Sequence, residues 1–122
     1  MTFEPYSDEV RKLFSHPEHA GEVDGGVESF VEDQGVRIRL TMAHIDDRIE
    51  ELRFQAWGCP HLLAACEWFC ATCETGTLAD LRHFERSELM QTLAVPVEKT
   101  GRILVLEDAV RSLGAAVRDT ST

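Results

Sequence analysis

The four cysteines of this 122-residue chain are its first candidates for chemistry, because all of them lie between Cys59 and Cys73. Cys59 stands in the segment Gly58-Cys59-Pro60, between a predicted strand and a predicted helix. Backbone N–H groups and the positive end of the helix dipole at such a junction stabilise a thiolate, which is both a nucleophile and a metal ligand. The alternative interpretation is a small residue that fills a turn.

The other three cysteines, Cys66, Cys70 and Cys73, share one face of the predicted helix because their spacing is i, i+4 and i+7. Three thiols on one face could hold a metal ion, and Cys70 and Cys73 have the C-x-x-C spacing. Redox C-x-x-C motifs open a helix, however, whereas this one lies near a helix end, and no second cysteine pair completes a zinc site. The pattern favours small core residues, with a metal site as the alternative.

Three further side chains are candidate metal ligands. His61 follows Cys59 by two residues and could join it, although we expect a first-turn histidine that faces solvent. Glu32 and Asp33 precede the strongest predicted strand, where a carboxylate could enter a site or simply belong to a charged loop. No G-x-S-x-G, Walker, dinucleotide-binding or H-E-x-x-H motif occurs. We therefore assign no catalytic residue and expect no enzyme.

The strands that must position these residues follow from alternation of apolar and polar side chains. This alternation predicts strands over 27–32, 36–42 and 52–57, with His44–Arg48 as the loop of an antiparallel hairpin. In the middle strand, the aliphatic side chains should be buried and Arg37 and Arg39 exposed.

Helical spacing of apolar residues predicts helices over 7–15, 60–74, 78–83, 86–93 and 100–118. The helix over 60–74 is apolar on nearly every side, so it should be buried. The predicted fold class is α+β, a three-stranded antiparallel sheet with helices packed on it, forming a single domain over 1–122.

Acidic residues outnumber basic ones by 22 to 12, which gives a formal charge of −10. Nucleic acids and anionic membranes attract basic surfaces, so neither is an expected partner, whereas a basic protein is permitted. Met1–Tyr6 has no charged start followed by an apolar run, and no apolar stretch approaches the roughly 20 residues that span a membrane. We expect a cytoplasmic protein with reduced thiols.

Four short motifs together resemble a known family. The first motif resembles an opening helix followed by a P-x-N-x-G turn, and it covers Tyr6–Val10 with 16–21. The second resembles a strand that ends in Gly-Cys, and it runs from Arg53-Phe54 through Gly58-Cys59. Val95–Lys99 resembles an L-P-P-V-K segment, and Glu107-Asp108-Ala109 resembles an E-D-A motif. In this order and spacing the motifs resemble the NifU/IscU-like iron–sulfur cluster scaffold family over nearly the whole chain.

The resemblance implies the SufE/NifU-like fold and a cluster held by three cysteines and an aspartate. Counted along this chain, the first cysteine falls on Glu32, with Gln34 in place of the aspartate, and the second is Cys59. The third falls on Arg102, and the histidine that precedes it in many members falls on Gly101. One of three thiolates survives, although iron–sulfur centres require soft thiolate ligands.

The resemblance therefore implies a protein of iron–sulfur cluster assembly, scaffold-like, with a degenerate or altered cluster or metal site. The alternatives are a paralogue that binds no cluster and acts as an interaction or regulatory partner, or a persulfide acceptor through Cys59. The cofactor would be an iron–sulfur cluster, iron, zinc or none. The implied partners are a cysteine desulfurase or a chaperone-type protein, the latter contacting Pro96 and Lys99.

Overall fold

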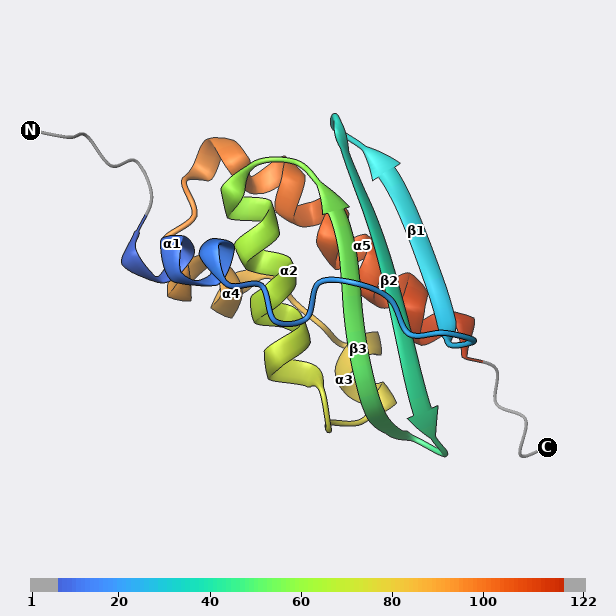
Figure 1. The fold of residues 1–122 in the computed structure, drawn as a ribbon. Helices are drawn as coiled ribbons and strands as arrows, with labels where there is room; N and C mark the ends of the chain where they lie inside the picture. Colours follow the sequence, from blue (N-terminus) through green and yellow to red (C-terminus); the bar gives the residue numbers. More distant parts are fainter. Residues whose placement is uncertain (1–6, 118–122) are drawn as a thin grey trace, which may run out of the picture.

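The computed structural model describes residues 7–117 and contains a three-stranded antiparallel sheet with helices on one face (Figure 1). The elements are α1 (Asp8–Ser15), β1 (Val27–Asp33), β2 (Val36–Ile45), β3 (Arg48–Trp57), α2 (Pro60–Cys73), α3 (Leu78–Arg82), α4 (Ser87–Thr92), the 3₁₀ turn η1 (Val97–Lys99) and α5 (Thr100–Ala116). The predicted α+β class is confirmed. The predicted end of the last helix at 118 and the Met1–Tyr6 segment lie outside the described residues.

The middle strand β2 pairs with β1 on one side and β3 on the other. Its aliphatic side chains point toward the helices and are at most 2% exposed, whereas Arg37 is exposed and Arg39 partly so. The predicted orientation of this strand is therefore confirmed. A shift by one residue would have exchanged the two faces.

Both hairpins close in two residues. Gln34 and Gly35 join β1 to β2 with φ of 52° and 76°, the left-handed conformation that tight hairpin turns require. The predicted loop His44–Arg48 is wrong in length, because Ile45 still pairs with Arg48 and Asp46-Asp47 alone make the turn. A bulge between Ala43 and His44 lets the strands continue to this point.

The helices α2 and α5 cover the inner face of the sheet, α2 against β3 and α5 against β1 and β2. The predicted burial of α2 is confirmed along its length, although Ala71 and Thr72 face solvent. Within the described part of the chain, no helix is long and apolar enough to cross a membrane.

The opposite face of the sheet is crossed by the segment 16–26, which follows α1 (Figure 1). It first runs along the free edge of β3, where Phe54 donates to the carbonyl of His19 (3.0 Å) and accepts from Gly21 N–H (2.8 Å). It then passes over the sheet, where the Val23 N–H donates to Thr41 Oγ1 (2.9 Å). The segment thus blocks the edge of β3 from pairing with another strand.

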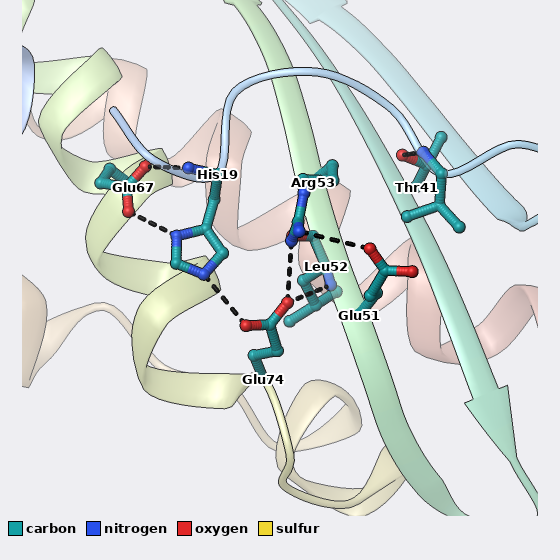
Figure 2. Close-up of polar contacts among 8 residues, drawn as sticks. His19, Thr41, Glu51, Leu52, Arg53, Glu67 and Glu74 are labelled. Carbon is teal, nitrogen blue, oxygen red and sulfur yellow. Dashed lines mark hydrogen bonds and ion pairs between the residues drawn. The ribbon is translucent and has the colours of Figure 1, made fainter. Parts of the chain in front are cut away.

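A polar cluster fixes this segment to α2 and β3 (Figure 2). Glu67, a buried residue of α2, accepts from both the backbone N–H and the Nδ1 of His19. Glu74 accepts from His19 Nε2 (3.1 Å), from Leu52 N–H (3.0 Å) and from Arg53 Nη1 (2.8 Å). The sequence showed no sign of this cluster, because its members are separated by up to 55 positions.

Candidate functional site

Cys59 lies where β3 ends and α2 begins, as the sequence predicted, and is the residue that precedes the first turn of α2. The chain turns sharply here because Gly58 has no side chain. A Cβ on Gly58 would lie 2.5 Å from Leu62 Cδ2 and 3.0 Å from Val36 Cγ1, closer than packed carbon atoms approach. Gly58 therefore sets the position of the thiol at the end of the sheet.

The electrostatic surroundings of Cys59 favour its thiolate. Partial burial raises the pKa of the thiol, but the Leu62 N–H, the Arg102 guanidinium and the His61 N–H outweigh it, so the pKa falls below its ordinary value. The two N–H groups belong to the first turn of α2, where backbone donors have no partner within the helix. A lowered pKa is what the sequence predicts for Cys59, and its role as a nucleophile or ligand stays a prediction.

The positions that the resemblance assigned to cluster binding converge in part. Arg102, in the first turn of α5, carries the guanidinium that lowers the pKa of Cys59. Gly101 precedes it, and a Cβ on Gly101 would lie 3.6 Å from Oε1 of Gln34, in the β1–β2 turn. Three separate segments of the chain thus meet around Cys59.

The two carboxylates proposed as ligands do not point toward Cys59. Glu32 shares the outer face of β1 with Glu28 and Phe30, and its Oε2 accepts from Arg37 Nε (2.9 Å). Asp33 Oδ1 instead accepts from the N–H of Gln34 (2.8 Å) and stabilises the turn. The tight hairpin orients Glu32 away from the helices and toward solvent.

The expectation that His61 faces solvent is wrong, since its side chain is only 3% exposed. Burial lowers the pKa of His61 and the charge of Lys99 lowers it further, with Glu98 acting in the opposite direction. Both charged residues belong to η1, so this turn lies near enough to the start of α2 for its charges to act on the ring.

The other three cysteines are core residues, as the sequence favoured. Cys66 and Cys70 are 0% exposed and Cys73 is 6% exposed. Burial raises the pKa of Cys66 and Cys70 far above the ordinary range and that of Cys73 to about 12. Among residues 7–117 no three His, Cys, Asp or Glu side chains are arranged to hold a metal ion.

The segment proposed to bind a chaperone, with Pro96 and Lys99, lies between α4 and α5 and forms the turn η1. Val97 in this turn is 84% exposed. The role of Pro96 and Lys99 stays a prediction.

Two features of the site were not assigned from the sequence. The effect of Arg102 on the pKa of Cys59 had an indirect signal, because the resemblance placed both residues at ligand positions and hence near each other. The cluster of His19, Glu67 and Glu74 had none beyond an unexplained glutamate within an apolar helix.

Comparison with known proteins identifies the class of fold. Residues 5–119 match the protein family described as NifU-like N terminal domain. The iron–sulfur cluster assembly protein IscU of Plasmodium falciparum is 24% identical over 112 residues, which cover 87% of this chain and 69% of the relative.

Solved structures show the same fold at low identity. A NifU-like N-terminal protein from Brucella abortus superposes with a TM-score of 0.75 at 11% identity, covering 94% of this chain and 95% of the other. A putative cluster assembly scaffold for the SUF system from Fervidobacterium islandicum gives 0.72 at 11% identity, covering 88% and 94%. The sheet and its covering helices are thus the fold that these structures share. The chain belongs to the NifU-like N-terminal domain family.

Proposed function

We propose that this protein serves iron–sulfur cluster assembly as a sulfur acceptor, in which Cys59 receives one sulfur atom from a cysteine desulfurase. The observation that carries the proposal is the pairing of a single, partly exposed thiol with a guanidinium group and two backbone N–H groups. These groups stabilise a thiolate, which is the reactive form of cysteine in sulfur exchange.

The residues present do not fit an iron–sulfur cluster bound in the family's manner. Glu32 points to the other face of the sheet, and Arg102 brings a positive charge to the position of the third cysteine. A guanidinium has no lone pair to give a metal. The remaining thiols, Cys66, Cys70 and Cys73, are enclosed in the core.

The chemistry requires no further reagent. The Cys59 thiolate attacks the outer sulfur of the desulfurase persulfide, and a bond forms between this sulfur and Cys59 Sγ. The sulfur–sulfur bond of the donor breaks, and its electron pair leaves with the inner sulfur as a thiolate. The exchange moves one sulfane sulfur without net oxidation. The chain is thus a carrier rather than an enzyme.

The test is sulfur transfer in vitro. The protein is mixed with a cysteine desulfurase and cysteine, then alkylated and digested. The masses of its peptides are measured by mass spectrometry. We expect one added sulfur on the peptide that contains Cys59, its loss in Cys59→Ser and its retention in Cys73→Ser. Absence of sulfur on Cys59 would contradict the proposal and favour a paralogue that acts by binding a protein partner.

A further inference from the structure

One edge of the sheet has no neighbour. The segment 16–26 runs along the free edge of β3, whereas β1 lies at the opposite edge and pairs with β2 alone (Figure 1). Among the described residues, no group hydrogen-bonds to the backbone of β1 from its open side. An edge of this kind can accept an extended segment as a further strand.

The pairing of the sheet shows which residues of β1 face the open side. In an antiparallel sheet the N–H and C=O of one residue point to the same side, and this side alternates from residue to residue. Phe54 uses both groups on the free edge of β3, so its neighbour Gln55 faces β2 and exchanges hydrogen bonds with Arg39. By the same alternation, Leu40 exchanges hydrogen bonds with Ser29 of β1. The residues of β1 whose backbone groups then point away from β2 are Glu28, Phe30 and Glu32.

The side chains of these three residues determine what kind of strand fits. They lie on the outer face of the sheet, and each is about half exposed. Toward β2, Glu32 pairs with Arg37 Nε (2.9 Å) and Glu28 lies 3.8 Å from Arg39 Nε. Arg39 also lies over the Phe30 ring, 5.4 Å from its centre. On the open side, a basic side chain would complete each glutamate row as basic, acidic and basic.

A second copy of this chain does not fit the same edge. Antiparallel pairing of β1 with itself about Phe30 would set Glu28 opposite Glu32 of the second copy, and parallel pairing in register would set each glutamate opposite itself. Like charges directly opposite each other destabilise a strand pair. The net charge of −10 on each copy adds repulsion over a longer range. The edge is thus protected against self-pairing but open to a basic segment.

We propose that the free edge of β1 is a docking site for a basic, extended segment of a partner protein, which joins the sheet as a fourth strand. The segment has the pattern basic–x–apolar–x–basic, so that its basic side chains meet Glu28 and Glu32 and its apolar side chain packs on Phe30. The two intervening side chains lie on the helix side of the sheet, next to Ser29 and Val31. Docking at this edge does not depend on the proposed function.

The first experiment measures the binding of labelled peptides to the wild-type protein by fluorescence anisotropy. The probe is Lys-Val-Tyr-Val-Lys flanked by glycines, and the control has glutamate in place of both lysines. We expect the basic peptide to bind at least about tenfold more tightly than the acidic one. Equal or reversed affinities would overturn the proposal.

Two further peptides separate strand pairing from charge attraction. Each carries one N-methyl group, on the nitrogen of the tyrosine or of the valine that follows it. Alternate backbone nitrogens of a paired strand face its neighbour and the solvent, so one of these peptides should bind about tenfold more weakly than the probe and the other nearly as well. The same affinity for both would show attraction by charge alone and would contradict docking as a strand.

Hydrogen exchange locates the bound peptide. In the free protein, the amide hydrogens of Glu28, Phe30 and Glu32 should exchange quickly, and those of Ser29 and Val31, which bond to β2, slowly. The peptide should slow the exchange of the first three. Unchanged exchange at these positions in a saturated complex would place the peptide elsewhere and overturn the assignment.

A charge exchange provides the matched variants, with urea unfolding as a check of the fold. Glu28→Lys combined with Glu32→Lys should lose the basic peptide and bind the acidic one. Glu18→Lys combined with Glu50→Lys changes the net charge equally at exposed positions outside β1 and should keep the wild-type preference. The same loss in both variants would reduce the effect to net charge. Sedimentation of the wild type completes the test, because a dimer that the basic peptide dissociates would assign the edge to a second copy instead.

Discussion

At the scale of single residues, the contrast among the four cysteines is one of burial and neighbouring charge. Cys59 is partly exposed beside Arg102, whereas Cys70 is enclosed among apolar side chains and further cysteines. A thiol in an apolar environment resists ionisation, since the charged form loses its solvation. The same residue type is therefore reactive at one end of α2 and inert along its length.

Cys59 should react first with an alkylating reagent under native conditions. Its pKa is lowered by its neighbours, while burial raises that of Cys73, the most exposed of the three core cysteines, to about 12. We expect iodoacetamide to label the Cys59 peptide well before any other, as read by peptide mass after brief exposure. Labelling of Cys70 or Cys73 at an equal rate would show that α2 opens readily, and the thiol site would then move to the helix face.

Much of this residue-level contrast could be predicted from the sequence. Helical spacing placed Cys66, Cys70 and Cys73 together on a buried face, and the Gly-Cys-Pro order placed Cys59 at a junction. The guanidinium beside Cys59 could not follow from spacing alone, because Arg102 lies 43 positions away. The face of the sheet on which Glu32 lies depends on the length of the β1–β2 turn. The local sequence specified that length only in part.

At the scale of elements, the site depends on how closely β3, α2 and α5 approach. Gly58 touches both α2 and β2, so it has no room for a side chain, whereas Gly101 in α5 has ordinary space around it. The packing around Gly58 therefore requires a glycine, whereas the packing around Gly101 does not.

Substitution of these glycines by alanine should have opposite effects. Gly58→Ala places a methyl group 2.5 Å from Leu62 and should lower the free energy of unfolding by about 1–3 kcal/mol. Gly101→Ala meets Gln34 at 3.6 Å and favours the helix, so it should raise the free energy of unfolding by about 0.5 kcal/mol. Urea unfolding of both variants provides the comparison, and equal effects would contradict the packing described for Gly58.

The cluster around His19 ties the segment 16–26 to the sheet and to α2 (Figure 2). Burial lowers the pKa of His19, but its contacts with Glu67 and then Glu74 outweigh this effect and raise the pKa above 6.5. Arg53, on β3, faces the same cluster and pairs with Glu74 and Glu51. The protonated ring thus lies between two carboxylates, with the arginine on the far side of one of them.

The stability that His19 provides should depend on pH in a defined direction. A group whose pKa is raised on folding stabilises fully below its unfolded value, here 6.5, and loses that contribution as the pH rises through the folded value. We expect His19→Gln to lower the free energy of unfolding by about 1.5–3 kcal/mol near pH 6 and by less near pH 9. Thermal or urea unfolding at both pH values tests this.

The matched control is His16→Gln, which alters an exposed histidine three residues earlier in the same segment. It should change the free energy of unfolding little at either pH. If His19→Gln were equally destabilising at both pH values, its role would be that of a neutral hydrogen-bonding residue and the ring would not act as a cation.

The elements themselves were predicted well, and the errors have physical causes. Alternation marked the centres of β2 and β3, but not the continuation of their pairing through a bulge to Ile45 and Arg48. His61, in the first turn of α2, was expected to face solvent but is buried, because the sequence gives no sign of what packs around this turn. Both errors concern contacts between elements rather than the elements' own periodicity.

At the scale of the whole molecule, charge is unevenly distributed along the sheet. The β2–β3 turn and the start of β3 carry the exposed acids Asp46, Asp47, Glu50 and Glu51 against Arg48. At the other end, Arg102 acts as a positive charge on Cys59, and Lys99 of η1 acts in the same sense on His61 while Glu98 opposes it. With a net charge of −10, most of the surface attracts cations, whereas Cys59 is influenced by the positive charge of Arg102.

Anaerobic reconstitution with ferrous iron and sulfide should therefore leave no cluster on this protein. The acidic surface will gather iron loosely, so the sample is passed over a desalting column with a chelator before iron is counted. We expect far fewer than the roughly two irons per chain of a [2Fe–2S] centre and no sulfide-to-iron absorption, because one accessible thiolate beside a guanidinium cannot replace the cysteines that such a centre requires. Two irons per chain that disappear in Cys59→Ser but persist in Cys66→Ser and Cys70→Ser would show that the altered site still holds a cluster. Dependence on Cys66, Cys70 and Cys73 instead would mean that α2 unpacks to bind metal, and the core cysteines would become the ligands.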